Sequence, residues 1–175
     1  VIKTGSPMKE VLDFYKEKIK SSMILEVLNL VNNNYFLASI HREENIENEE
    51  NFTKILKILN SLVEKYNYPI IFSTHPRTRK KIQKINFKLS HKIRLIKPLS
   101  FSAYNKLQIS SKVVLSDSGT INEESSILNF PALNIRESHE RPEAMEEASV
   151  MMPGLNLEKV ESCLKILESQ NINQK

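Results

Sequence analysis

The segment Asp117-Ser118-Gly119-Thr120 has the residue types that bind a phosphate group. Ser118 and Thr120 offer hydroxyls, and Gly119 lets the backbone come close to a ligand. A helix that starts directly after them would add unpaired N–H groups and the positive end of its dipole. The segment therefore predicts a diphosphate cradle. An ordinary capped helix start has the same residue types, and these residues alone leave both interpretations open.

Two more side chains could do chemistry beside such a cradle. Glu124, in the run Asn122-Glu123-Glu124, could accept hydrogen bonds from ribose hydroxyls or simply suit the start of a helix dipole. His41 could be a proton donor, a phosphate ligand or a plain loop histidine. We expect no metal site and no cofactor, because no metal-ligand spacing joins the remaining candidates, His41, His75, His139 and Asp117.

The elements that must position these residues can be read from the apolar pattern. Short apolar runs without polar alternation, typical of strands buried on both faces, occur at 35–40, 69–73, 93–96, 113–116, 131–135 and 149–152. Helical spacing fills the intervals at 7–19, 24–31, 52–66, 76–84, 100–109, 121–128, 142–147 and 157–167. Residues 41–48 are expected to form a polar loop, and Ser6 and Pro7 to cap and begin the first helix. The alternation predicts an α/β fold, a Rossmann-like parallel sheet with helices on both faces.

The predicted strands would deliver the polar residues to one edge of that sheet. Ligands of open parallel sheets bind beyond the carboxyl ends of the strands. His41 and Arg42 follow the first strand, His75 and Arg77 the second, the 117–120 segment the fourth, and residues 136–141 the fifth. The arginines along this edge favour an anionic ligand.

Composition narrows the function classes. The chain has 175 residues, 25 of them basic and 21 acidic, and no apolar run approaches the roughly 20 residues of a membrane span. Its three glycines cannot build the glycine-rich loops of dinucleotide-binding or P-loop proteins. The basic residues are spread over several helices, so we expect no nucleic-acid partner. Cys163, the one cysteine, fits a core position and a reducing, cytoplasmic location.

Three motifs in order resemble the UDP-N-acetylglucosamine 2-epimerase family of the non-hydrolysing bacterial type. They are His-Arg-Glu-Glu-Asn at 41–45, the run 117–124, and His-Glu-Arg-Pro-Glu at 139–143. Residues 4–7 resemble the segment that crosses between the two domains of a glycosyltransferase-B-like fold. The resemblance implies that residues 1–20 are an interdomain linker and helix and residues 21–175 the C-terminal UDP-binding domain. The N-terminal domain would be absent, in keeping with a chain that begins at Val1 rather than Met.

The resemblance also implies roles for individual residues at the reaction centre. His41 would be catalytic, beside the diphosphate and the reacting sugar. Ser118, Gly119 and Thr120 would hold the diphosphate, and Glu124 would accept the ribose hydroxyls.

Five more residues take roles by the same resemblance. Arg141 and Arg77 would bring positive charge to the UDP site, and Phe101 would border the uracil. Arg42 and Glu44 would meet a second, regulatory substrate molecule.

The activity implied is a UDP-sugar 2-epimerase that inverts carbon 2 of a UDP-2-acetamido sugar by eliminating UDP and adding it back. Residues 138–143 and 146–152 resemble the branch that acts in UDP-N-acetyl-L-fucosamine synthesis, a part of cell-envelope polysaccharide biosynthesis. The partners implied are the UDP-sugar, the chain's own N-terminal domain and a second copy in a homodimer, with no membrane. We expect this chain alone to be inactive. The alternatives are a glycosyltransferase of the same fold and a non-catalytic UDP-sugar-binding module.

Overall fold

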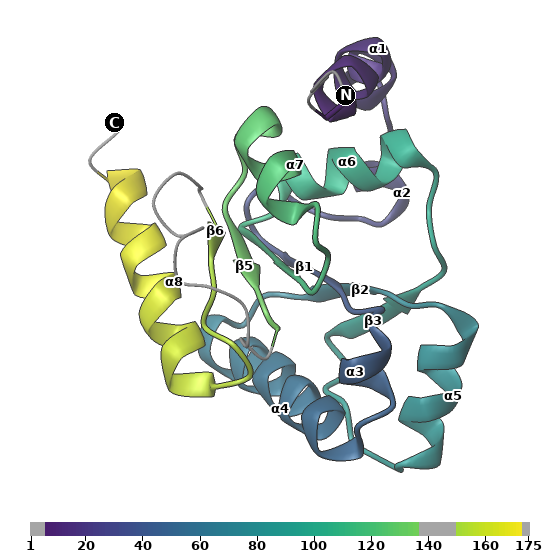
Figure 1. Ribbon diagram of the computed structural model, residues 1–175, viewed down its shortest axis with the longest axis vertical. Coiled ribbons are helices and arrows are strands. Elements are labelled where there is room, and N and C mark those ends of the chain that lie inside the picture. Colours follow the sequence, from purple (N-terminus) through teal and green to yellow (C-terminus); the bar gives the residue numbers. More distant parts are fainter. Residues whose placement is uncertain (1–5, 137–149, 173–175) are drawn as a thin grey trace, which may run out of the picture.

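A six-stranded parallel sheet organises the residues that the computed structural model describes, 6–136 and 150–172 (Figure 1). The strand order is β3-β2-β1-β4-β5-β6, and every neighbouring pair is parallel. The strands are β1 (Phe36–Ser39), β2 (Ile70–Ser73), β3 (Ile93–Ile96), β4 (Val113–Ser116), β5 (Ala132–Asn134) and β6 (Val150–Met151). All six predicted strands are confirmed, and the α/β fold class with them.

The central strand β1 decides where the sheet can hold a ligand. It pairs with β2 on one side and with β4 on the other, so that Ser39 lies opposite both Ser73 and Ser116. The chain builds outward through β2 and β3 first and then through β4, β5 and β6 on the other side. The order reverses between β1 and β4, and such a reversal leaves a crevice beyond the strand ends.

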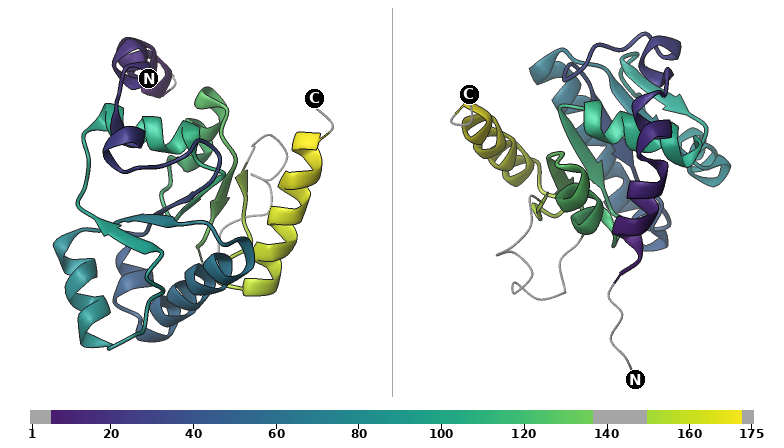
Figure 2. Two further views of the ribbon diagram at one scale, coloured as in Figure 1. Left: turned by 180° about the vertical axis from the view of Figure 1, so that it is seen from behind. Right: turned by 90° about the horizontal axis from the view of Figure 1, so that it is seen from above.

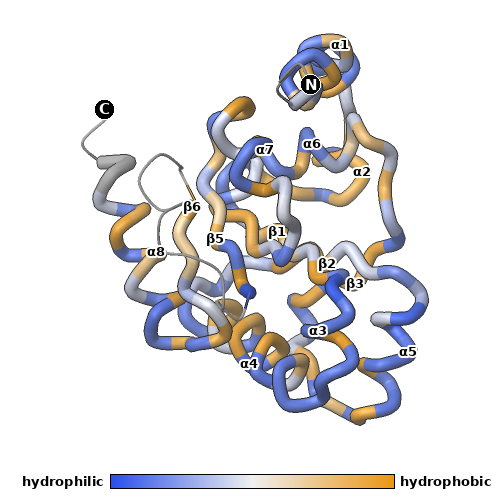
Figure 3. The backbone as a smooth tube through the Cα atoms, viewed as in Figure 1, coloured by the Kyte–Doolittle hydropathy of each residue, from blue (hydrophilic) through white to orange (hydrophobic). Residues whose placement is uncertain are grey.

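In and just before β1, successive side chains are buried under helices on opposite faces of the sheet. Phe36 and Ala38 pack in one cluster with α4 (Glu49–Tyr66), α5 (Pro76–Lys84) and α8 (Leu157–Ile172). Tyr35 and Leu37 pack in the other with α2 (Ile24–Val27), α6 (Phe101–Ser110) and α7 (Ile121–Leu128). Figure 2 shows the two helix layers from further sides, and in Figure 3 the strands are mostly hydrophobic while the helices carry hydrophilic outer faces. The expected placement of Cys163 is close to the observed one, since it is partly buried against the first cluster.

The first two helices differ in their bounds from the sequence expectation. Helix α1 (Met8–Lys20) begins one residue later than expected, with Pro7 at the N-cap position and the Ser6 hydroxyl accepting the Met8 N–H at 3.2 Å. Helix α2 ends at Val27 rather than near residue 31, because Asn29 turns to a φ of 48°. A residue in the left-handed region ends a helix.

The polar loop expected at 41–48 contains a short helix, α3 (Glu43–Ile46). The next helix, α4, begins at Glu49 rather than Phe52, because the Asn48 side chain accepts the N–H of Asn51 and caps it. Helix α6 is capped by Ser100 rather than Ser102. The helix expected at 142–147 lies outside the described residues. In the described ranges, no helix has both the length and the apolar character needed to cross a membrane.

Candidate functional site

A buried carboxylate joins the two loops that meet where the strand order reverses. Asp117, directly after β4, has a relative exposure of 0%. Its oxygens accept the backbone N–H groups of His41 at 3.1 and 3.2 Å and of Arg42 at 3.0 Å. The side-chain amide of Asn45 in α3 donates to it as well, at 3.0 Å. Asp117 therefore ties the start of the β1–α3 segment to the end of β4.

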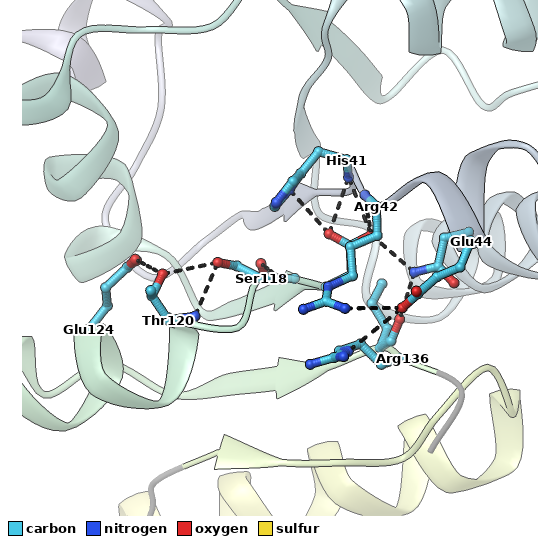
Figure 4. A network of polar contacts seen from close by, with 11 residues as sticks. His41, Arg42, Glu44, Ser118, Thr120, Glu124 and Arg136 are labelled. Atoms are coloured by element: carbon cyan, nitrogen blue, oxygen red, sulfur yellow. Dashed lines mark hydrogen bonds and ion pairs between the residues drawn. The ribbon is translucent and has the colours of Figure 1, made fainter. Parts of the chain in front are cut away.

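The His41 side chain is open to solvent on one side and held on the other. Its side chain is 57% exposed, and its Nδ1 lies 3.1 Å from Asp117 Oδ1. Figure 4 shows His41 and Arg42 beside the segment that carries Ser118 and Thr120, and the two groups come from the adjacent strands β1 and β4. The expectation that these motifs share one edge of the sheet is thus confirmed.

Ser118, Thr120 and Glu124 form a chain of hydrogen bonds at the start of α7. The Thr120 hydroxyl donates to Glu124 Oε1 at 2.6 Å, and the Ser118 and Thr120 hydroxyl oxygens are 3.0 Å apart. Thr120 has one hydroxyl proton and gives it to the carboxylate, so Ser118 must be the donor in the second bond. Gln108 of α6 donates to the other carboxylate oxygen at 2.7 Å. Glu124 is therefore fixed from both sides, and Figure 4 shows its contact with Thr120.

Positive charge lies against the glycine of this segment. A Cβ built on Gly119 would be 3.6 Å from Arg42 Nη2, so the guanidinium group packs on the glycine backbone. Arg42 Nη1 lies 3.2 Å from Glu44 Oε1, and Arg136 Nε lies 3.9 Å from the same oxygen. The structure thus places Arg42, expected at a regulatory site, directly beside the expected diphosphate cradle.

Arg77 and His75 lie apart from the cradle, at the end of β2. Arg77 Nη1 is 3.0 Å from Glu43 Oε1, and its Nε is 4.0 Å from Glu47. His75 caps α5, since its Nδ1 accepts the Arg77 N–H at 3.4 Å. A pocket of about 300 Å³ opens here, lined by His41, Glu43, Ile46, Glu47, His75, Arg77 and Thr78. His41 thus borders both the pocket and the cradle segment, whereas Arg77 faces acidic side chains.

Phe101 and Tyr104 stand one turn apart on α6. Phe101 is 40% exposed and contacts the Tyr15 ring with centroids 5.1 Å apart. Tyr104, which the sequence analysis did not select, lies deeper, and its pKa is raised to about 12. Burial is the main cause, the negative charges of Glu124 and Asp117 add to it, and a hydrogen bond with Ser39 opposes it. The Tyr104 hydroxyl is therefore close enough to Glu124 and Asp117 for their negative charges to raise its pKa.

Sequence reasoning missed the residues that hold others in place. Asp117 and Asn45 stand inside motifs of the sequence, but the sequence assigns neither of them a role in holding other residues, and Gln108 stands in no motif. An acid directly after a buried strand is the signal that could have pointed to Asp117; nothing local marks Gln108.

Arg141 and His139 lie outside the described residues. Among the described residues, no group of three or more His, Cys, Asp or Glu side chains is placed to hold a metal ion.

The chain is similar to known proteins in both sequence and structure. The whole chain, residues 1–175, matches the family model described as UDP-N-acetylglucosamine 2-epimerase. The chain belongs to this family. A curated relative from Methanocaldococcus jannaschii, named UDP-N-acetylglucosamine 2-epimerase, is 33% identical over 150 residues, which are 83% of this chain and 41% of that protein. The chain spans about half the length of the curated relatives it matches, or less.

Solved structures agree with the family assignment. The UDP-N-acetylglucosamine 2-epimerase from Rickettsia bellii is 45% identical, with a TM-score of 0.80 over 93% of this chain and 43% of that one. The enzyme from M. jannaschii, solved in complex with UDP-GlcNAc and UDP, is 30% identical, with a TM-score of 0.83 over 95% of this chain and 47% of that one. These neighbours have a glycosyltransferase-B-like fold, which confirms the expected architecture. The expected L-fucosamine branch stays a prediction.

Proposed function

We propose that this chain forms the UDP-binding half of a UDP-sugar 2-epimerase. One observation carries the proposal: the hydrogen-bonded chain Ser118–Thr120–Glu124 lies beside the Arg42 guanidinium, where the strand order reverses. Hydroxyls, a helix start and a cation suit a diphosphate, and a carboxylate suits a sugar with two hydroxyls. The family assignment, and a 30% identical relative solved with UDP-GlcNAc and UDP, support the same ligand.

In this proposal each part of UDP meets a different part of the site. The diphosphate lies on Ser118, Gly119 and Thr120, where the first turn of α7 has N–H groups without partners inside the helix. The ribose hydroxyls bind Glu124. Gln108 and Thr120 each donate to one carboxylate oxygen, and each oxygen keeps a further lone pair to which a ribose hydroxyl can donate.

The aromatic side of the site would receive the uracil. Phe101 borders the base, as the resemblance implies, and its 40% exposure leaves it accessible. Arg77 and Arg141 add positive charge to the UDP site in the same proposal. In the structure the pairing of Arg77 with Glu43, at 3.0 Å, reduces the charge that it can offer.

The proposed reaction removes UDP from the sugar and adds it back with carbon 2 inverted. The leaving UDP gains negative charge, so hydroxyls, helix N–H groups and the Arg42 guanidinium on this side would stabilise the transition state. His41, exposed and next to the cradle, would act at the diphosphate and the reacting sugar.

The remainder of the enzyme would face this half across a cleft. Residues 1–20 would link the two domains and residues 21–175 would form the C-terminal domain. The acid and base groups for carbon 2 would come mostly from the other domain, so we expect the chain alone to bind UDP without epimerising it. Detection of UDP-sugar turnover by this chain would contradict that division. A homodimer and a regulatory substrate near Arg42 and Glu44 belong to the same proposal.

Calorimetric titration of the chain with UDP tests the proposal, with GDP as the nucleotide control. Glu124→Ala should weaken UDP binding roughly 10- to 100-fold, because a hydrogen bond to a charged group contributes about 1.5–3 kcal/mol. Glu123→Ala is the matched control, since it removes the same charge from the same helical turn. Equal loss in both variants, or no preference for UDP over GDP in a folded chain, would contradict the proposed site.

A further inference from the structure

The carboxylate of Asp117 is buried in a place where it cannot meet a ligand directly. Its relative exposure is 0%, and the groups that it contacts are the backbone N–H groups of His41 and Arg42 and the side chains of His41 and Asn45. A buried carboxylate is costly unless donors surround it. Here the donors belong to the segment that carries the exposed candidate residues.

In the described part of the chain, two side chains contact the Asp117 carboxylate, those of Asn45 and His41, and only that of His41 extends to solvent. Its Nδ1 lies 3.1 Å from Asp117 Oδ1, and its side chain is 57% exposed. A neutral imidazole carries one proton, and the nitrogen that does not hold it is an acceptor. A carboxylate next to Nδ1 favours the proton on Nδ1, because an unprotonated nitrogen there would face the negative oxygen.

His75, at the end of the neighbouring strand, has the opposite surroundings. Its Nδ1 accepts the backbone N–H of Arg77 at 3.4 Å, so the proton of the neutral ring belongs on Nε2. The two histidines line the same pocket. They therefore offer different atoms to whatever lies between them.

We propose that Asp117 is a positioning residue for His41: its carboxylate, 3.1 Å from Nδ1, keeps the proton of the neutral ring on Nδ1, so that Nε2 faces outward as an acceptor. Its bonds to the two backbone N–H groups fix the loop at the same time, which holds the Arg42 guanidinium against Gly119. This inference deepens the role of His41 and so rests on the proposed function. Asn45 supports the same carboxylate from α3, at 3.0 Å.

Long-range proton–nitrogen correlation spectra of the 15N-histidine-labelled chain test this inference. The spectra are recorded at about pH 9, well above the ordinary histidine pKa of about 6.5, so that the tautomer can be read from the two ring nitrogens. We expect the Nδ1–H form for His41 and the Nε2–H form for His75 in the same spectrum, with His41→Gln identifying the His41 signals. A His41 ring found mostly in the Nε2–H form would overturn the proposal, and this reading needs no variant of Asp117.

Asp117→Asn then separates positioning from mere support of the fold. The amide keeps the shape of the side chain but loses its charge, so the Nδ1–H preference of His41 should be lost while the His75 pattern stays as it was. An unchanged His41 pattern in the folded variant would overturn the proposal. If Asp117→Asn does not fold, Asn45→Ala serves instead: with one donor fewer on the carboxylate, the Nδ1–H form of His41 should persist or strengthen, and its loss would count against the assignment.

UDP titration of the wild-type chain keeps the two proposals distinguishable. A chain that shows the expected His41 tautomer but does not bind UDP contradicts the proposed function and supports the contact between Asp117 and His41. A chain that binds UDP with His41 in the Nε2–H form contradicts the positioning role alone.

Discussion

Gly119 is the residue of the proposed diphosphate site that has no side chain, and this absence can be tested by a single substitution. Nothing in its backbone demands glycine, because its φ is not in the left-handed region and an added Cβ would meet Arg42 Nη2 at an ordinary 3.6 Å. The hydroxyl of its neighbour Ser118 donates to that of Thr120, which in turn donates to Glu124. In the proposed function we therefore expect the glycine to matter for the approach of the diphosphate rather than for the fold.

Gly119→Ala should separate binding from stability. We expect the free energy of unfolding to change by no more than about 0.5 kcal/mol, while UDP binding weakens because the methyl group stands where the diphosphate would approach. Urea denaturation and calorimetric titration measure the two effects. Gly154→Ala is the matched control: Gly154 has a φ of 65°, so alanine there should cost about 1–2 kcal/mol and leave UDP binding intact. Equal destabilisation by the two variants would contradict this view of Gly119.

In helix α4 a polar residue, Asn48, fixes where a largely buried helix begins. The helix buries eight residues, and seven of them, among them Phe52, Leu56 and Leu59, pack in the cluster on one face of the sheet. Its start follows α3 almost directly, and Asn48 marks the boundary by accepting the Asn51 N–H at 3.1 Å. The cap thus separates the segment that carries His41 and Arg42 from the helix that anchors it.

Asn48→Ala should lower the free energy of unfolding by about 1 kcal/mol, because an N–H at the start of α4 loses its partner. The midpoint of urea denaturation checks this. Asn32→Ala, at an exposed turn position, is the control and should shift the midpoint little. If Asn48→Ala shifts the midpoint no more than Asn32→Ala, the cap does not hold the start of α4.

At the scale of the whole molecule, two helix layers around one sheet bury tyrosine hydroxyls as well as apolar side chains. Tyr35 donates to the Leu107 carbonyl at 2.7 Å, and burial raises its pKa. The pKa of Tyr104 rises to about 12, again mainly through burial. The folded chain therefore holds these protons more tightly than the unfolded chain, in which a tyrosine has a pKa of about 10.

Stability should accordingly fall at alkaline pH. The contribution of these protons is complete below about pH 10 and is lost as the pH rises through the folded-state pKa of about 12. Urea midpoints measured from about pH 8 to about pH 11 should decline towards the alkaline end. Tyr104→Phe removes one of the groups and should make the decline shallower relative to its own value at neutral pH. An equally steep decline in that variant would show that Tyr104 is not titrating in this way.

Residue patterns along the chain predicted the strands, most of the helices and the residues that could do chemistry. All six strands lie within their predicted runs, and the residues after the first, second and fourth strands meet at one edge of the sheet. The apolar pattern could show this much because a short apolar run marks a strand buried on both faces, and the carboxyl ends of parallel strands share one edge of the sheet. The short helix α3 was missed because its four residues are too few to show a period.

The tertiary structure was needed to show which of these residues lie in contact. Strand order placed β4 beside β1, and so joined Asp117 to His41 and the cradle segment to Arg42, while β2 carried Arg77 to Glu43 on the other side. Gln108 reached Glu124 from a different helix. These pairings depend on contacts between segments far apart in the chain and on the exclusion of water from a buried carboxylate, and no local pattern of residues records either.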